Sequence, residues 1–103
     1  MQHAFTVEGR NLVVTLGSEI DHHQVSLIFE ELEKQSQLHL TKNIIFDFGQ
    51  VIFMDSAGIG LVMGAYKRTA SVGGCTMVCN VSSKVDRVLR MSGVYRFVRI
   101  MEL

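Results

Sequence analysis

The residues with the clearest chemical potential occupy one segment, residues 53–67. An aspartate and a serine stand together near its beginning, Asp55 and Ser56. Such a pair can cap a helix, accept a phosphate or serve a nucleophilic site. Three glycines follow inside an apolar pattern of helical spacing: Gly58, Gly60 and Gly64. Each glycine costs a helix roughly 1 kcal/mol relative to alanine, so something must offset that cost. We predict that Gly64 packs closely against the sheet, and that Gly58 and Gly60 leave backbone bare for another chain or a phosphate.

Ser56 has two readings that the spacing alone leaves open. In the first, Asp55 and Ser56 only start a helix, since such residues are the usual helix caps. In the second, Ser56 is a switch, because a phosphate adds about −1.5 to −2 charges at that point. The free N–H groups and the positive dipole end of the helix would tolerate this charge. A partner surface fitted to a neutral hydroxyl would not.

Other chemistries have weaker support. A hydrolase triad of Ser56, His22 and Asp55 lacks the G-x-S-x-G motif, and its acid directly precedes its serine. The glycine spacing at residues 58–60 lacks the third glycine of a dinucleotide motif and the ending of a P-loop. His22 and His23 are helix neighbours that point about 100° apart, with no third metal ligand in view. We therefore expect no enzyme activity, no metal and no cofactor, with a small nucleotide- or anion-binding domain as an alternative.

Length and composition indicate one domain covering residues 1–103. Apolar residues make up 48% and charged residues 19%, with no proline, which excludes a disordered chain. No apolar run approaches the roughly 18 residues of a membrane span, and the first residues do not resemble a secretory signal. We expect a cytoplasmic protein that does not bind a membrane. Cys75 and Cys79 lie about 13 Å apart on a predicted strand, which is too far for one disulfide or one shared metal.

The charges are balanced overall but not along the chain. Residues 1–59 contain three basic and eight acidic side chains, whereas residues 60–103 contain seven basic and two acidic ones. This asymmetry could polarise the surface for a charged partner, but it is too modest to predict direct DNA binding. The basic row Lys84, Arg87 and Arg90 is interpreted as a solvated face that could also touch an acidic partner.

The apolar patterns predict an α/β fold with a small, mixed, mostly parallel sheet. The expected order is ββαβαβα followed by a short C-terminal strand or extended tail. The predicted elements are a hairpin at residues 5–7 and 12–16, a helix opened by Asp21, a strand at 43–48, a loop at 49–55, a helix at 56–70, a strand at 75–79, a helix from Ser82 or Ser83 to Gly93, and the tail at 97–101. Capping boxes are predicted between Asp21 and Gln24 and between Ser83 and Asp86.

This order places several polar residues on one surface. The loops that leave the second and third strands emerge at the same carboxyl edge, where open α/β sheets bind ligands and partners. Asp21, His22, His23, Asp55 and Ser56 should therefore lie together.

The same residues resemble the STAS family, the sulfate-transporter and anti-sigma-factor-antagonist domain. The resemblance covers nearly the whole chain. Within the family, the chain is most similar to the sporulation branch, whose members antagonise the anti-sigma F factor. Three blocks carry it: residues 17–23 (GSEIDHH), residues 53–60 (FMDSAGIG) with Gly64 and Tyr66-Lys67, and residues 91–94 (MSGV).

The resemblance implies a non-enzymatic binding module with the STAS fold. The unphosphorylated form would bind a partner that is both anti-sigma factor and serine kinase, and so free the sigma factor. The kinase would phosphorylate Ser56 and end the binding, and a serine phosphatase would reset the switch. The docking surface would contain Asp21, Asp55, Ser56 and Gly58, and we extend it to their neighbours His22, His23, Ala57 and Gly60. A STAS module of another pathway, such as a general-stress regulator or a signalling scaffold, is an alternative.

Two departures from the family pattern matter. Ala57 stands where sporulation proteins usually have a second serine, so Ser56 is the one acceptor in the motif. The chain also stops at Leu103, where many relatives continue with an amphipathic helix. The surface beneath that helix would then be exposed, so we expect a monomer or a weak dimer.

Overall fold

The main structural element of the molecule is a five-stranded sheet. The computed structural model describes residues 3–101. The strand order is β1-β2-β4-β6-β7, and every neighbouring pair is parallel except β1 with β2. The strands are β1 (Ala4–Glu8), β2 (Asn11–Thr15), β4 (Asn43–Asp47), β6 (Thr76–Cys79) and β7 (Arg99–Met101). The predicted hairpin and the mostly parallel sheet are therefore confirmed.

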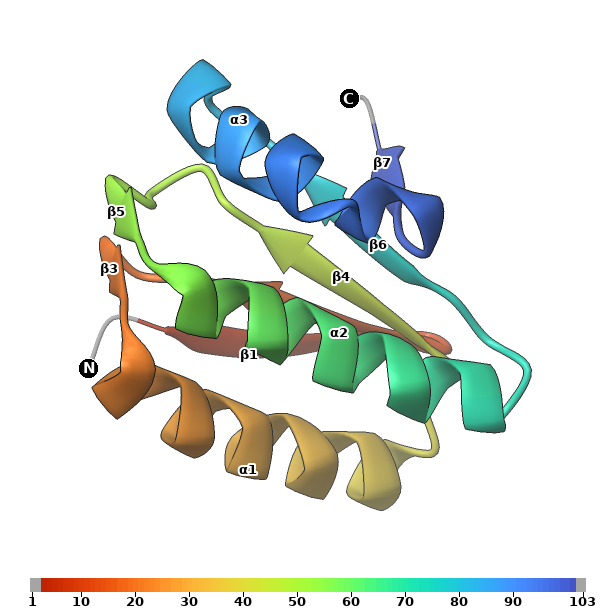
Figure 1. Cartoon of the computed structure of the whole chain (residues 1–103). Helices are drawn as coiled ribbons and strands as arrows, with labels where there is room; N and C mark the ends of the chain where they lie inside the picture. The colour runs from red at the N-terminus through yellow and green to blue at the C-terminus, as the bar shows by residue number, and fades with distance from the viewer. Residues whose placement is uncertain (1–2, 102–103) are drawn as a thin grey trace.

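Three helices cover one face of this sheet (Figure 1). They are α1 (His22–His39), α2 (Ser56–Ser71) and α3 (Ser83–Ser92). Each connects two parallel strands, and the three crossovers step across the sheet in the same direction. Because such crossovers are right-handed, all three helices lie on the same side. Their first turns consequently gather at the carboxyl edge of the sheet.

The core lies between the sheet and the helices. Alternate residues of β2, Leu12 and Val14, are fully buried, as the period of a strand requires. In α1 the buried residues recur every four positions, at Ile28, Leu32 and Ser36. The buried hydroxyl of Ser36 accepts a hydrogen bond from the Thr41 hydroxyl at 3.0 Å, so this polar group is satisfied inside the core.

The predicted loop at residues 49–55 contains a short strand that the sequence did not reveal. β5 (Phe53–Met54) pairs in parallel with β3 (Glu19–Ile20), forming a separate two-stranded sheet. Ile52 and Phe53 also donate backbone hydrogen bonds to the carbonyl of Ser18, at 2.8 and 3.1 Å. A pair of two-residue strands is too short for an alternating pattern, which explains why periodicity missed it.

The C-terminal region is a parallel edge strand, not an extended tail. Gly93 ends α3 with a positive φ of 79°, which glycine adopts without strain. A 3₁₀ helix, η1 (Val94–Arg96), then turns the chain toward β7. Val94 and Val98 are buried in the same core as the three helices.

Both predicted capping boxes are wrong in their second half. The Gln24 side chain does not reach back to Asp21; its carbonyl oxygen instead lies 2.8 Å from Nε2 of His3. Asp86 likewise makes no bond to Ser83, because its carboxylate accepts hydrogen bonds from Tyr95 and Arg90. The cap of α3 is Ser82, whose hydroxyl accepts the N–H of Val85 at 3.2 Å.

Within residues 3–101, no helix combines the length and apolar character needed to cross a membrane.

Candidate functional site

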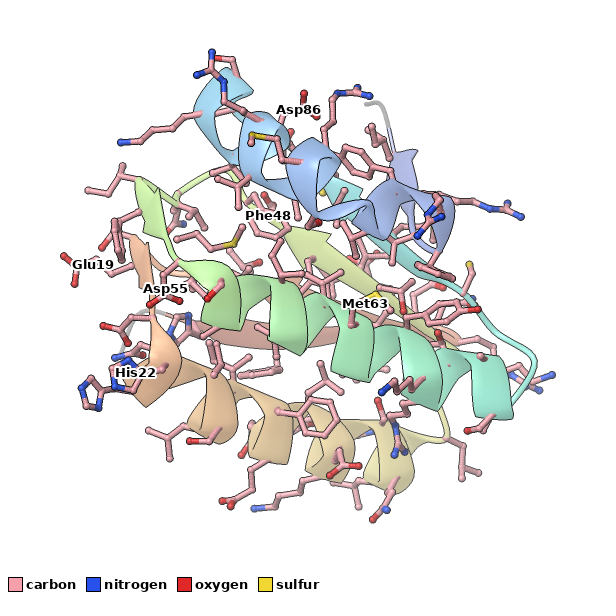
Figure 2. The ribbon with its side chains drawn as sticks, viewed as in Figure 1. Glu19, His22, Phe48, Asp55, Met63 and Asp86 are labelled. Atoms are coloured by element: carbon pink, nitrogen blue, oxygen red, sulfur yellow. The ribbon has the colours of Figure 1, made fainter. Side chains whose placement is uncertain are left out.

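Two aspartates mark neighbouring helix starts at the carboxyl edge. In the β3–β5 pair, Ile20 lies opposite Met54, so the residues that follow them, Asp21 and Asp55, leave the small sheet side by side. The backbone N–H of Asp55 donates to the carbonyl of Ile20 at 3.2 Å, which fixes this arrangement. Figure 2 shows Glu19, His22 and Asp55 at this end of the molecule. The structure thus brings the predicted residues together.

Each aspartate is the N-cap of the helix that follows it. Oδ1 of Asp21 accepts the N–H groups of His23 and Gln24 at 3.0 and 3.1 Å. Oδ1 of Asp55 accepts the N–H of Ala57 at 2.8 Å. These bonds satisfy backbone donors that a helix start leaves free. The prediction that Asp55 caps the helix is therefore confirmed, and the Ser56 side chain does not cap it.

Ser56 is the first residue of α2, and its side chain is exposed to solvent. Among the described residues, none forms a hydrogen bond with its hydroxyl group. The hydroxyl is therefore accessible and chemically uncommitted. The two segments that form the starts of α1 and α2, residues 11–33 and residues 43–66, contain no lysine or arginine.

The three glycines of α2 do different things, and two expectations about them are wrong. Gly58 is not bare: it is buried, and a Cβ there would lie 2.4 Å from Cγ and Sδ of Met54. Gly64 packs against a helix and not against the sheet, because its Cβ would lie 3.0 Å from the Phe29 ring of α1. Gly60 is exposed with open space around its Cβ position, as predicted.

The two histidines at the start of α1 are exposed, and their rings are 4.0 Å apart between centroids. The structure contains no group of three metal-ligating side chains among its described residues, so they do not form part of a three-ligand cluster there. They instead widen the polar surface beside Asp21.

A third histidine, His3, which sequence analysis missed, fixes the segment between β2 and α1 through two hydrogen bonds. Nδ1 of His3 accepts the N–H of Gly17 at 2.8 Å, which leaves Nε2 to donate to Oε1 of Gln24. His3 therefore links the end of β2 to the first turn of α1. It lies 14 and 21 residues from these partners, so no local spacing could have revealed it.

Two exposed apolar side chains also went unnoticed. Ile52 and Phe53 are 68% and 48% exposed, and they directly precede the Met54-Asp55-Ser56 segment. Large apolar groups exposed beside a polar site are typical of protein-binding surfaces. No local sequence signal marked them, because residues 49–55 were predicted to be a loop and the strand β5 was not foreseen.

The cysteines do not contribute to this surface. Both are free, and Cys79 is buried. Burial, together with the nearby Asp47 carboxylate, raises the pKa of the Cys79 thiol above its usual value. The thiol is thus protonated and unreactive at neutral pH, as expected for a core cysteine.

The basic row on α3 is partly engaged in internal contacts. Arg90 donates from Nε to Asp86 at 2.8 Å and lies over the Tyr95 ring at 5.1 Å. The hydroxyl of Tyr95 donates to the same carboxylate at 2.7 Å. The hydrogen bonds from Tyr95 and then from Arg90 hold the pKa of Asp86 below its ordinary value. Lys84 and Arg87 form no salt bridge with any of the described residues, so they remain a solvated face.

Comparisons with known proteins bear on the family and the fold. The model of the STAS domain family matches residues 3–102. An anti-sigma F factor antagonist of Paenibacillus polymyxa is 34% identical over 89 residues, which cover 86% of this chain and 76% of the relative. One of Lysinibacillus sphaericus is 32% identical over 88 residues, which cover 85% and 75%.

Two solved structures share the fold. The anti-sigma factor antagonist SpoIIAA in its unphosphorylated form is 30% identical with a TM-score of 0.86, over 98% of this chain and 87% of that one. The Bacillus cell fate determinant SpoIIAA in its phosphorylated form is 29% identical with a TM-score of 0.78, over 98% and 90%. A protein of this kind therefore exists in both states.

Proposed function

The chain belongs to the STAS-domain family, among the non-enzymatic anti-sigma factor antagonists, and we propose that Ser56 is its phosphorylation switch. The unphosphorylated form binds an anti-sigma factor that is also a serine kinase and so frees the sigma factor. Phosphorylation of Ser56 by this kinase ends the binding, and a serine phosphatase restores it. The likeness to anti-sigma F factor antagonists supports the sporulation branch and a cytoplasmic location over a general-stress or scaffold role.

The exposed and unbonded hydroxyl of Ser56 is the single observation that carries this proposal. Its oxygen attacks the γ-phosphorus of ATP held by the kinase. The new P–O bond forms as the bond to the leaving ADP breaks, and the hydroxyl proton passes to a base of the kinase. This chain contributes position only, because the α2 cap of Asp55 fixes where the hydroxyl stands.

The docking surface surrounds Ser56 at the carboxyl edge. Its exposed or half-exposed members are Asp21, His22, His23, Asp55, Ala57 and Gly60, to which we add Ile52 and Phe53. Gly58 supports this surface from below, because the absence of a side chain lets Met54 pack over α2. The docking surface thus presents small side chains at its centre and larger apolar or imidazole side chains around them.

Release follows from charge. The phosphate brings close to two negative charges to an edge that already carries Glu19, Asp21 and Asp55. The two segments that form this edge, residues 11–33 and residues 43–66, contain no lysine or arginine that could pair with the phosphate. A dianion buried in a contact without a cation costs several kcal/mol, and about 1.4 kcal/mol already weakens binding tenfold.

A matched pair of variants tests the proposal. Ser83 is also an exposed serine at the first position of a helix, α3. Affinity for a purified anti-sigma factor kinase of the same organism is measured for the wild type, Ser56→Ala, Ser56→Asp and Ser83→Asp. We expect Ser56→Asp to bind at least about tenfold more weakly. Ser56→Ala should bind like the wild type and, unlike it, stay bound when ATP is added.

Equal affinity of Ser56→Asp and Ser83→Asp would overturn the switch. The alternative of a small nucleotide- or anion-binding domain predicts heat of binding when ATP, GTP or phosphate is added to the isolated chain. We expect no such heat.

A further inference from the structure

An apolar groove runs between α1 and α2 and reaches the first turn of α2. It has a volume of about 410 Å³. Val25 and Phe29 of α1 form one wall, and α2 supplies the other wall and the floor through Ala57, Gly60, Leu61 and Gly64. Ala57 directly follows Ser56, so the groove begins at the proposed switch.

Two glycines create the hollow. Gly64 lets the Phe29 ring approach the backbone of α2, since a Cβ at residue 64 would lie 3.0 Å from that ring. One turn earlier, a Cβ at Gly60 would meet nothing within 4 Å apart from its chain neighbours and the nearby backbone of its own helix. The groove is therefore narrow at Gly64 and open at Gly60, the end nearer to Ser56. Helix propensity favours alanine at both positions, so the open space at Gly60 is unexplained by folding alone.

The groove lies within reach of any protein that docks on Ser56. A helix rises 1.5 Å per residue, which places Gly60 roughly 6 Å and Gly64 roughly 12 Å along α2 from Ser56. A standard interface covers about 800 Å² on each partner, equivalent to a disc about 16 Å in radius. An interface centred on Ser56 is therefore large enough to include the groove.

We propose that the anti-sigma factor kinase seats an apolar side chain in this groove when it docks around Ser56, an inference that rests on the proposed function. Apart from the Ser26 hydroxyl at its rim, the side chains of the lining are apolar. A polar or charged group would lose its water there and gain no partner, whereas a leucine, methionine or phenylalanine would bury carbon against carbon.

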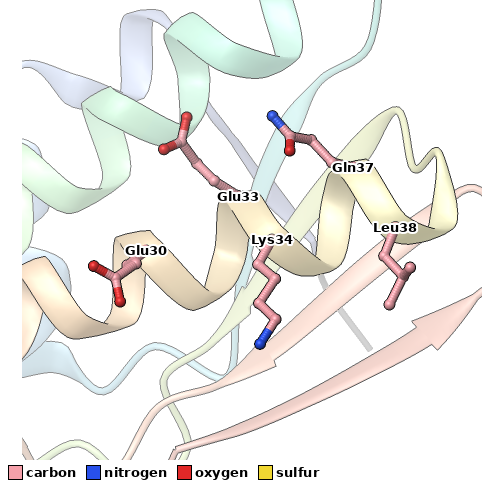
Figure 3. Close-up of a pocket in the computed structure, with 5 residues that line it drawn as sticks. All are labelled: Glu30, Glu33, Lys34, Gln37 and Leu38. Atoms are coloured by element: carbon pink, nitrogen blue, oxygen red, sulfur yellow. The ribbon is translucent and has the colours of Figure 1, made fainter.

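Other hollows of the surface fit this role less well. The one in Figure 3 lies on the outer side of α1 and is lined by Glu30, Glu33 and Lys34 with Gln37 and Leu38. Its charged groups favour water over an apolar side chain. Another lies around Leu40 and Val72, where α1 and α2 end, far from Ser56 along both helices.

Filling the groove from this chain tests the inference. Gly60→Leu places a side chain where no atom stands, and the exposed Ala70 near the far end of the same helix gives the matched control, Ala70→Leu. Thermal unfolding followed by circular dichroism should show both variants folded. Calorimetry with the anti-sigma factor kinase should show Gly60→Leu weakened at least about tenfold and Ala70→Leu within about twofold of the wild type.

A second variant approaches the groove from the other helix. Ser26 lines the rim and is exposed, so Ser26→Leu should weaken binding in the same direction. Ser56→Asp is measured in the same series. Weak binding by Ser56→Asp with wild-type binding by both groove variants would overturn the groove inference and leave the switch intact. Failure of the wild type to bind the kinase would overturn both.

Discussion

The first turns of α2 and α3 are built alike and surrounded differently. Each follows a parallel strand, has an N-cap whose side chain accepts one backbone N–H, and begins with an exposed serine, Ser56 or Ser83. Beyond that, α2 continues with Ala57 and a glycine, whereas α3 continues with Lys84 and a valine.

Their surroundings differ even more. The start of α2 is joined through β5 and β3 to the start of α1, which brings a second aspartate, Asp21, to the same edge as Asp55. The start of α3 instead carries Lys84 and Arg87. Its one carboxylate, Asp86, already accepts hydrogen bonds from Arg90 and Tyr95. A phosphate on Ser56 would therefore meet negative charge, and one on Ser83 would meet positive charge. Two locally equivalent serines become unequal through what the fold places next to them.

The strongest test of this difference is phosphate incorporation. With the anti-sigma factor kinase and ATP, Ser56→Ala should lose incorporation completely, whereas Ser83→Ala should match the wild type. The reason is that the docking surface presents Ser56, and not Ser83, to the kinase. Intact-protein mass spectrometry followed by peptide mapping measures both. Phosphate found on Ser83 in the wild type would contradict the comparison.

The third helical residue of each start should respond oppositely to a change in volume. Val85 is buried in the core, so Val85→Ala should lower the free energy of unfolding by about 2 kcal/mol through lost contacts and a cavity. Gly58 lies under Met54, so Gly58→Val should cost about 1–3 kcal/mol through overpacking. Urea unfolding measures both, and a Gly58→Val protein as stable as the wild type would show that Met54 moves freely.

The two caps should be worth nearly the same. Asp55 and Ser82 each accept one backbone N–H, from Ala57 and Val85. Replacing either cap by alanine should therefore lower the free energy of unfolding by about 1 kcal/mol. Ser83→Ala serves as the control, because that hydroxyl caps nothing, and should change it by less than about 0.5 kcal/mol. A loss for Ser83→Ala as large as for Ser82→Ala would mean that the cap is misassigned.

The smallest expected effect concerns the charge on α3. The hydrogen bond from Tyr95 is the main cause of the lowered pKa of Asp86, so Tyr95→Phe should raise that pKa toward its usual value. A group whose pKa is lowered by folding stabilises the protein above its unfolded pKa, near 3.9, and loses this effect as pH falls through the folded pKa.

The stability difference between the wild type and Tyr95→Phe should therefore be larger at pH 7 than at pH 2.5. An NMR titration of the Asp86 carboxyl group, with unfolding measured at both pH values, checks this. An unchanged Asp86 pKa in Tyr95→Phe would show that Arg90 alone sets it.

The sequence predicted correctly those features that depend on residues close together in the chain. The caps Asp21 and Asp55 are local, because each bonds N–H groups two or three residues ahead. Helix periodicity gave α2 as residues 56–70 against the observed Ser56–Ser71. The strand and helix order then placed the helix starts at one edge, since right-handed crossovers allow a single arrangement.

Predictions from local sequence patterns failed where contacts between distant segments of the chain decide the outcome. The reading of Gly58 as bare backbone missed Met54, which is only four residues earlier but belongs to β5, a strand that pairs with the distant β3. The reading of Gly64 missed Phe29, which lies on another helix 35 positions away. His3, Ile52 and Phe53 were missed because their roles depend on burial and on long-range hydrogen bonds.

The sequence by itself determined the α/β class, the order of the main elements and the serine at the start of α2, because propensity, capping and hydrophobic period act between near neighbours. Only the tertiary structure decided which glycine is buried, which lines a groove, and which carboxylates surround Ser56. Those facts depend on the pairing of β3 with β5 and on the packing of α1 against α2. Such contacts join segments more than thirty residues apart, and no local spacing encodes them.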